Sequence, residues 1–163
     1  MSDAGGHTAW VALGANLGDP LATLQRALSE LAAHPHMRLE ARSHFYRTAP
    51  VESSGPDYVN AVARLRTTLA PLDLLDALQG IELAHGRERP YRNAPRTLDL
   101  DLLAYDDLQL DTPRLTLPHP RMHARAFVLR PLADIDPDLA LPRGRVRDLL
   151  MACTDQDVSQ LAD

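Results

Sequence analysis

The chain has 163 residues, of which 45% are hydrophobic and 24% are charged, and its formal net charge is −5. This composition is typical of a folded globular chain and excludes an intrinsically disordered one, and no run of about 18 apolar residues is present that would predict a transmembrane helix. The acidic balance disfavours nonspecific binding of nucleic acid, and the single cysteine, Cys153, favours a reducing compartment.

Hydrophobic periodicity and turn residues predict alternating strands and helices along the chain. Asp19 is expected to cap a helix that begins at Pro20, and Pro71 is expected to begin a second helix. In chain order we expect strands over 8–15, 37–47, 58–65 and 97–105, helices over 20–34, 71–86 and 124–133, loops over 48–56 and 87–96, and a short hairpin involving 108–110.

The order strand, helix, strand, strand, helix, strand is that of a ferredoxin-like α+β sandwich, a mainly antiparallel sheet with helices packed on it. No repeat or long linker interrupts this order, so we expect one domain over residues 1–163, with the last ten residues frayed. The first six residues lack the basic and apolar regions of a signal peptide, and we expect a cytoplasmic protein.

Two aspartates alternate with leucines in the predicted strand over 97–105. Because strand side chains alternate, Asp99 and Asp101 share one face, about 7 Å apart at their Cα atoms, and the leucines occupy the other face. Neighbouring carboxylates repel each other unless a hard cation such as Mg²⁺ lies between them, and two such ions could also hold a polyphosphate. The alternative is a half-exposed strand whose outer face happens to be acidic.

Arginines are concentrated in the predicted loop directly before this strand. The four are Arg87, Arg89, Arg92 and Arg96. Each guanidinium can clamp phosphate oxygens in a bidentate fork, although a solvated loop with weak ion pairs would also explain them. Next to the paired aspartates they favour a metal–phosphate site. Since the chain has no P-loop, no dinucleotide-binding glycine motif and no evident activated nucleophile, magnesium and arginines would have to hold any ATP.

Three other polar residues are candidates for contacts with a nucleotide. Gln79 and Glu82 share one face of the predicted second helix, where they could meet a nucleotide or simply face solvent. His119 lies between two prolines that fix its backbone, so its imidazole suits a phosphate contact or proton transfer, unless it is a plain loop histidine. His123 is four residues further on, but no third ligand is evident and zinc is disfavoured.

Two aromatic residues could form a stacking slot for a flat ring. The chain has only one tryptophan, four tyrosines and two phenylalanines, which draws attention to Tyr58 and Phe127. Core packing is the usual role of such a pair. Asn60 would face the same side of its strand as Tyr58 and could offer its amide to the edge of a stacked ring.

An ordered set of short segments carries a resemblance to a known family. The segments are ALGANLG (12–18), FYRT (45–48), DYVN (57–60), IEL (81–83), GRER (86–89), PRTLDLD (95–101) and LPH (117–119), followed by Arg125 and Phe127. Extending over roughly residues 11–139, this set resembles the 6-hydroxymethyl-7,8-dihydropterin pyrophosphokinase family of folate biosynthesis.

The resemblance implies a ferredoxin-like fold and transfer of diphosphate from ATP to the hydroxymethyl oxygen of the pterin, with release of AMP. The residues assigned to catalysis would be Arg87, Arg96, Asp99 and Asp101, and the two aspartates would hold two Mg²⁺ ions. The pterin site would consist of Thr48, Val51, Tyr58, Asn60 and Phe127. The ATP site would consist of Gln79, Glu82, Arg89, Arg96, Leu102, Arg114, Thr116, His119 and Arg125. With two small-molecule substrates, we expect a monomer that binds neither nucleic acid nor membrane.

The chain departs from the family pattern at two positions, and two other functions remain open. Asn93 stands where many members have tryptophan, and Pro120 where a large residue is common, so closure of the arginine loop could differ. A nucleotide-sugar transferase with the same aspartate pair would bind sugar nucleotides and no pterin, and Tyr58, Asn60 and Phe127 argue against it. A ferredoxin-like regulatory module would bind a ligand without turnover, leaving the aspartates and arginines without a shared purpose.

Overall fold

A six-stranded antiparallel sheet forms the centre of the computed structural model, which describes residues 6–49, 56–85, 98–153 and 156–161. The strand order is β10-β3-β4-β1-β5, and β2 also pairs with β4. The strands are β1 (His7–Ala15), β2 (Met37–Arg42), β3 (Tyr46–Thr48), β4 (Tyr58–Thr67), β5 (Asp99–Tyr105) and β10 (Val158–Gln160). Of these, β1 lies between β4 and β5 and pairs with both, so it is the central strand for the site described below.

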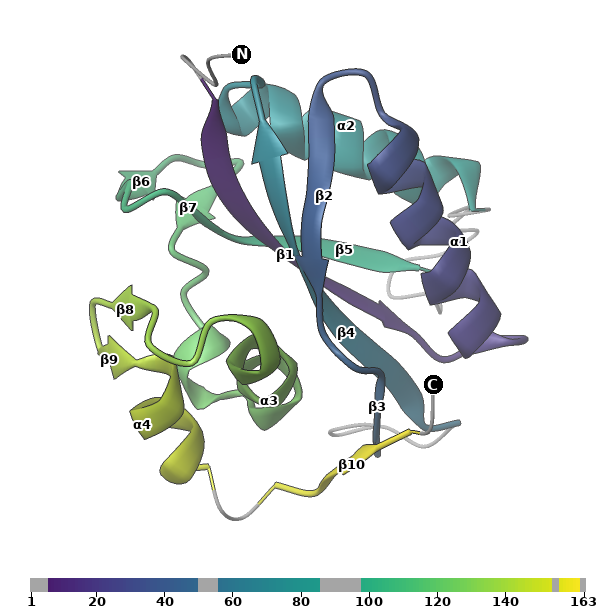
Figure 1. Ribbon diagram of the computed structural model, residues 1–163, viewed down its shortest axis with the longest axis vertical. Coiled ribbons are helices and arrows are strands. Elements are labelled where there is room, and N and C mark those ends of the chain that lie inside the picture. Colours follow the sequence, from purple (N-terminus) through teal and green to yellow (C-terminus); the bar gives the residue numbers. More distant parts are fainter. Residues whose placement is uncertain (1–5, 50–55, 86–97, 154–155, 162–163) are drawn as a thin grey trace.

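Two helices pack on one face of this sheet, α1 (Pro20–Ala33) and α2 (Pro71–Ala84), as Figure 1 shows. Each begins at the predicted proline. The Asp19 carboxylate accepts a hydrogen bond from the backbone N–H of Ala22 at 3.2 Å, which confirms the predicted N-cap. Because strand side chains alternate between faces, every second residue of β1, β4 and β5 meets the leucines of the two helices in one apolar core.

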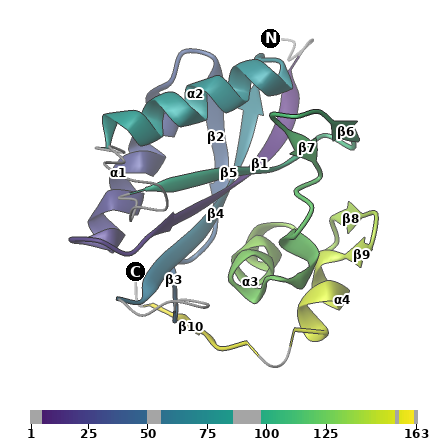
Figure 2. The same cartoon turned by 180° about the vertical axis from the view of Figure 1, so that it is seen from behind.

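The opposite face of the sheet carries a second layer, formed by the C-terminal half of the chain. Seen from behind in Figure 2, α1 and α2 lie on one side of the sheet, and α3 and α4 lie on the other. Trp10 of β1 is buried in the core of this layer, and its indole N–H donates to Asp136 at 2.7 Å. The elements of this layer are the 3₁₀ turn η1 (Met122–Ala124), α3 (Ala126–Ile135), β8 (Ala140–Leu141), β9 (Gly144–Arg145) and α4 (Val146–Met151). The hairpin of β6 (Leu110–Asp111) and β7 (Thr116–Leu117) precedes them and packs with the core of α1 and α2 instead.

The predicted ferredoxin-like α+β fold is confirmed. Its order of strand, helix, strand, strand, helix, strand corresponds to β1, α1, β2, β4, α2 and β5. In the sheet, β4 separates β2 from β1, and β5 pairs with the other side of β1. The layer of α3 and α4 is an addition to this pattern, and it leaves the sheet covered on both faces. Within the described ranges, no helix combines the length and hydropathy needed to cross a bilayer.

The predicted continuous strand over 37–47 is wrong, because Ser43 divides it. Its hydroxyl accepts a hydrogen bond from the backbone N–H of Val62 at 2.9 Å and donates to the His44 carbonyl at 2.7 Å. A side chain therefore takes a place in the ladder that a backbone group would otherwise fill. As a result, β2 and β3 pair with successive parts of β4 as two separate strands.

Three predictions in the C-terminal half also need correction. The hairpin uses residues 110–111 and 116–117 rather than 108–110, because residues 108 and 109 after the turn at Asp106 and Asp107 are irregular and join no strand. The helix expected over 124–133 begins two residues later, since η1 takes up the first turn. The tail is not frayed over Val158–Gln160, because β10 pairs with β3 and the N–H of Leu161 donates to the Phe45 carbonyl at 2.8 Å.

Candidate functional site

Small and polar side chains occupy one end of the sheet face that lies opposite α1 and α2, beyond the apolar core around Trp10. In the register of β1, Gly14 is paired with Asn60 of β4 on one side and with Asp99 of β5 on the other. Two residues earlier, Ala12 is paired with Asp101. Because side chains alternate along a strand, these residues face away from the leucine core. The predicted placement of both aspartates on one face is therefore consistent with the register.

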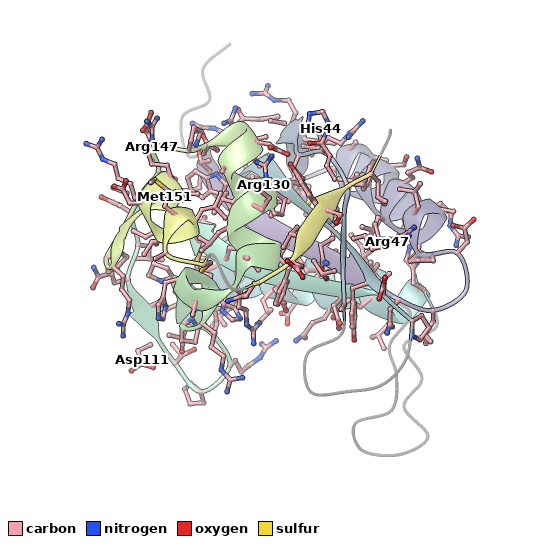
Figure 3. All side chains as sticks on the ribbon, turned by 90° about the horizontal axis from the view of Figure 1, so that it is seen from below. His44, Arg47, Asp111, Arg130, Arg147 and Met151 are labelled. Atoms are coloured by element: carbon pink, nitrogen blue, oxygen red, sulfur yellow. The ribbon has the colours of Figure 1, made fainter. Side chains whose placement is uncertain are left out.

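A cavity of about 680 Å³ lies over this face. It is bounded by the sheet, by the start of α3, and by the segment that leads into β10; Figure 3 views this side, where β10 runs beside α3 and its labelled Arg130. The lining residues are Ala12, Leu13, Gly14, Thr48, Ala49, Tyr58, Asn60, Asp99, Asp101, Ala124, Arg125, Phe127, Val128, Gln156, Asp157 and Val158. Seven of the predicted site residues are thus brought to one cavity: Thr48, Tyr58, Asn60, Asp99, Asp101, Arg125 and Phe127.

The part of the cavity near β3 and β4 combines aromatic and amide groups. Tyr58 and Phe127 come from β4 and α3, and both are half-buried in the lining. Asn60 is buried, and its Nδ2 donates to the Thr48 hydroxyl at 2.8 Å. This bond fixes the orientation of the amide, and it leaves the amide oxygen directed toward Gly14, where an added Cβ would lie 3.2 Å from Oδ1. A residue with a side chain at position 14 would therefore crowd the cavity floor.

The other part of the cavity carries the two carboxylates. Asp99 is half-buried and Asp101 is exposed. Two oxygen-bearing ligands on one strand suit a hard cation such as Mg²⁺, which keeps several water or phosphate ligands of its own. Among the described residues no group of three or more histidine, cysteine, aspartate or glutamate side chains could enclose a metal. Two carboxylates supply only part of the oxygen shell of such an ion, so water or other oxygen ligands would have to complete it.

Further predicted residues lie along the outer edge of β5, the last strand in the sheet order of the described residues. Glu82 of α2 is only 4% exposed, and its Oε2 accepts a hydrogen bond from the backbone N–H of Leu100 at 2.8 Å. The N–H of His119 donates to the Leu103 carbonyl at 2.7 Å. Two backbone groups of β5 are thus engaged from outside the sheet. Leu100 lies between the two aspartates, so Glu82 holds the strand at the point where they project.

His119 is held as a neutral ring. Burial, followed by the positive charges of Arg125 and Arg121, lowers its pKa from 6.5 to about 4. Its Nδ1 accepts the backbone N–H of Arg121 at 3.1 Å, so the proton of the neutral imidazole resides on Nε2. At neutral pH this side chain can donate one hydrogen bond, and it adds no charge.

The remaining predicted nucleotide contacts lie between α2 and the β6–β7 hairpin. The Arg114 guanidinium donates to Asp76 at 2.6 Å and to Gln79 at 3.5 Å, which connects the hairpin to the helix. Thr116 lies in β7, and Leu102 is buried in β5. None of the predicted residues at the outer edge lines the cavity: Gln79, Glu82, Leu102, Arg114, Thr116 and His119. Val51, Arg87, Arg89 and Arg96 lie outside the described residues, as do Arg92 and Asn93.

Sequence reasoning missed several residues of the cavity. Gly14 could have been found, because it follows Ala12 at a two-residue spacing and small residues on alternate strand positions indicate close approach. Gln156, Asp157 and Val158 carried no such signal, because they belong to a short polar segment without periodicity. Their place in the lining depends on the pairing of β10 with β3, more than a hundred residues earlier in the chain.

Comparison with known proteins gives one consistent result. Residues 10–137 match the family model described as 7,8-dihydro-6-hydroxymethylpterin-pyrophosphokinase (HPPK). A protein of Pseudomonas aeruginosa named 2-amino-4-hydroxy-6-hydroxymethyldihydropteridine pyrophosphokinase is 52% identical over 154 residues, which is 93% of this chain and 95% of that protein. The protein of the same name from Haemophilus influenzae is 46% identical over 140 residues, or 85% of this chain and 88% of that one.

Solved structures agree in fold. The Plasmodium falciparum HPPK-DHPS crystal structure with pteroate superposes with a TM-score of 0.75 over 92% of this chain, at 13% sequence identity. This chain spans 43% of that longer one, and at this identity the likeness concerns the fold. The family model covers most of the chain, and relatives about half identical cover nearly all of it. The chain therefore belongs to the 7,8-dihydro-6-hydroxymethylpterin-pyrophosphokinase family.

Proposed function

We propose that this chain transfers a diphosphate from ATP to 6-hydroxymethyl-7,8-dihydropterin, which yields AMP and the pterin diphosphate in folate biosynthesis. Relatives that are 46% and 52% identical carry the name of this pyrophosphokinase activity. The observation that carries the proposal is the cavity itself. It places an aromatic and amide slot, suited to a flat polar ring, beside a pair of carboxylates suited to a metal-bound polyphosphate.

The pterin is proposed to bind between Tyr58 and Phe127. Both rings line the cavity from elements on opposite sides of it, as a stacking slot requires. Asn60 and Thr48 would read the polar edge of the ring, and their mutual hydrogen bond of 2.8 Å fixes the donors and acceptors before the substrate arrives. Val51 is assigned to the same edge by the family resemblance.

Asp99 and Asp101 are proposed to hold two Mg²⁺ ions together with the ATP phosphates. Bound there, the ions would neutralise phosphate charge and polarise the phosphorus that is attacked. The two residues occupy neighbouring positions on the cavity side of β5, so a phosphate chain held by them would lie next to the pterin slot. Arg125 lines the same cavity and carries a positive charge toward it, and Arg87, Arg89 and Arg96 are assigned to the phosphates by the resemblance.

ATP is proposed to extend from this point along the outer edge of β5. Gln79, Glu82, Leu102, Arg114, Thr116 and His119 lie on that side and are assigned to it. The neutral ring of His119 can donate Nε2–H to a phosphate oxygen without a change of protonation near pH 7. In the reaction the pterin hydroxyl oxygen forms a bond to the β-phosphorus, and the bond from that phosphorus to the α–β bridging oxygen breaks. AMP leaves with the bridging oxygen, and the hydroxyl proton passes to solvent. Alignment and charge neutralisation, rather than a strong nucleophile, supply the rate enhancement.

We further propose that the enzyme is monomeric, cytoplasmic and formed by a single domain, as expected from the sequence.

A direct test is AMP release from ATP in the presence of Mg²⁺, with and without 6-hydroxymethyl-7,8-dihydropterin. We expect release only with the pterin, and a loss of about a hundredfold or more in Asp101→Asn, because several kcal/mol of charge stabilisation depend on the metal site. Asp111→Asn is the matched control, since Asp111 is an exposed carboxylate on β6 that lies outside the cavity.

The outcomes separate the alternatives. Pterin binding without AMP release would indicate a regulatory module. Binding of sugar nucleotides without pterin would indicate a nucleotide-sugar transferase. Equal activity of Asp101→Asn and the wild type would remove the proposed metal site.

A further inference from the structure

One side-chain amide connects the C-terminal segment to the start of α3. The Gln156 Oε1 accepts a hydrogen bond from the backbone N–H of Ala126 at 2.9 Å, and the amide nitrogen Nε2 of the same side chain donates to the Ala124 carbonyl at 2.8 Å. The two bonded backbone groups lie on either side of Arg125. A single planar amide thus bridges the junction between η1 and α3, and it satisfies one donor and one acceptor at once.

This junction has no local side chain that could do the same. Arg125 occupies the N-cap position of α3 without a side-chain capping hydrogen bond. Its carbonyl accepts the N–H groups of Val128 and Leu129, whereas the N–H at the first position of the helix needs a partner from outside. Gln156, thirty residues further along the chain, supplies that partner. It therefore contributes a tertiary contact where most helices have a local cap.

The two residues whose direction this junction sets both face the proposed substrate. Arg125 and Phe127 line the cavity, and the Arg125 guanidinium carbon lies 5.5 Å from the centre of the Phe127 ring. Arg125 has extended backbone angles and Phe127 is already in the helix, so a small rotation at the junction would move both side chains. The amide of Gln156 holds the backbone directly before and directly after Arg125.

The other end of the connection is anchored to the polar edge of the cavity. Val158, two residues after Gln156, is paired with Thr48 in the β10–β3 register, and Thr48 accepts the hydrogen bond of Asn60. The C-terminal segment is therefore fixed to one wall of the cavity by a strand, and to the opposite wall by one side chain. Gln156 and Val158 lie beyond positions 10–137, which the family model matches, whereas the residues that they contact lie within that range.

We propose that Gln156 is a positioning residue of the pterin site, which sets the distance between the Phe127 wall and the Thr48–Asn60 edge through its two backbone hydrogen bonds. This inference rests on the proposed function, because it takes the cavity to be the pterin site. It assigns to residues 156–158 a part in substrate affinity, in addition to the pairing of β10 with β3 at the edge of the sheet.

The test compares Gln156→Ala and Gln156→Glu with the control Gln160→Ala, which removes the same residue type from an exposed position on β10. Gln156→Glu keeps an acceptor for the Ala126 N–H, but it places a carboxylate oxygen against the Ala124 carbonyl. The measurements are the dissociation constant of 6-hydroxymethyl-7,8-dihydropterin by calorimetry, the steady-state KM and kcat at saturating Mg²⁺ and ATP, and the Tm of each variant.

We expect both Gln156 variants to raise the pterin KM and dissociation constant about tenfold, with kcat at saturating pterin within about threefold of the wild type, and Gln160→Ala to change neither. A lower Tm with unchanged pterin affinity would overturn the inference and leave Gln156 as a helix cap only. An equal loss of affinity in Gln160→Ala would overturn it as well. If Gln156→Ala does not fold, the isosteric Gln156→Glu decides. Absence of pterin binding by the wild type would instead refute the proposed function, so the two failures are distinguishable.

Discussion

Replacing Glu82 by alanine should destabilise the fold and slow the reaction together. Its carboxylate is 4% exposed and accepts the N–H of Leu100 at 2.8 Å, at the one residue that separates Asp99 from Asp101. In Glu82→Ala that N–H remains buried against α2 without this acceptor. The two aspartates would then project from a strand that has lost one hydrogen bond on its outer edge, so their spacing would be less strictly fixed.

The expected decrease in the free energy of unfolding follows from the loss of one buried hydrogen bond and from the small cavity that the truncated side chain leaves. Leaving a buried donor unsatisfied costs about 1–3 kcal/mol, and truncation of a buried side chain adds to this, so we expect the free energy of unfolding to fall by about 2–4 kcal/mol. Glu82→Gln keeps an acceptor oxygen of the same reach, and we expect it to lose about 1 kcal/mol. Leu83→Ala, at the neighbouring and 64% exposed position, should lie within about 0.5 kcal/mol of the wild type.

Urea unfolding measures the change in the free energy of unfolding. Pterin-dependent AMP release, at a temperature where each variant is folded, measures the change in kcat. We expect kcat in Glu82→Ala to fall about tenfold, because a metal pair tolerates little change in the spacing of its carboxylates. A contact between Glu82 and ATP, as the family resemblance assigns, would appear as a higher KM for ATP in both variants. Stability and kcat in Glu82→Ala equal to those of Leu83→Ala would refute the reasoning.

Three further predictions concern other parts of the site and its supports. Gly14→Ala should raise the pterin KM about tenfold with little change in Tm, since its Cβ would lie 3.2 Å from the Asn60 amide oxygen on the cavity floor; unchanged pterin kinetics would contradict this. His119 should titrate near pH 4 by NMR, and because its pKa is lower when folded than unfolded, its contribution to stability should be complete above about pH 6.5 and decrease as the pH falls toward 4. Tyr46→Phe removes the 2.6 Å hydrogen bond from the tyrosine hydroxyl to Asp134 and should cost about 1–2 kcal/mol in urea unfolding, while a change below about 0.3 kcal/mol would show that Asp134 is satisfied without it.

The elements that were predictable from the sequence are those specified by neighbouring residues. Asp19 and Pro20 mark the start of α1 because an N-cap and a proline at the first helical position act locally. Leucine and aspartate alternate in β5 because one face of that strand meets a leucine core and the other meets a cavity. The ferredoxin-like order follows from such local signals, taken one after another.

The elements that were missed depend on partners far away in the chain. Nothing near Val158 indicates a strand, because the segment is polar and its partner is β3. Ser43 interrupts a strand only because its hydroxyl meets the N–H of Val62 on β4. Likewise Tyr58 and Phe127 belong to different elements, so the residues alone favoured core packing over a stacking slot, and only the family resemblance implied the slot.

Strand β5 connects the two halves of the proposed site. Its alternating side chains present Asp99 and Asp101 to the cavity, where the pterin is proposed to bind, while its outer backbone edge is held by Glu82 and His119 on the side proposed for ATP. A phosphate chain that reaches from that edge to the pterin hydroxyl must therefore pass the two carboxylates. The proposed metal site would account for two acidic residues on the last strand of the described sheet, where their mutual repulsion would otherwise destabilise the fold.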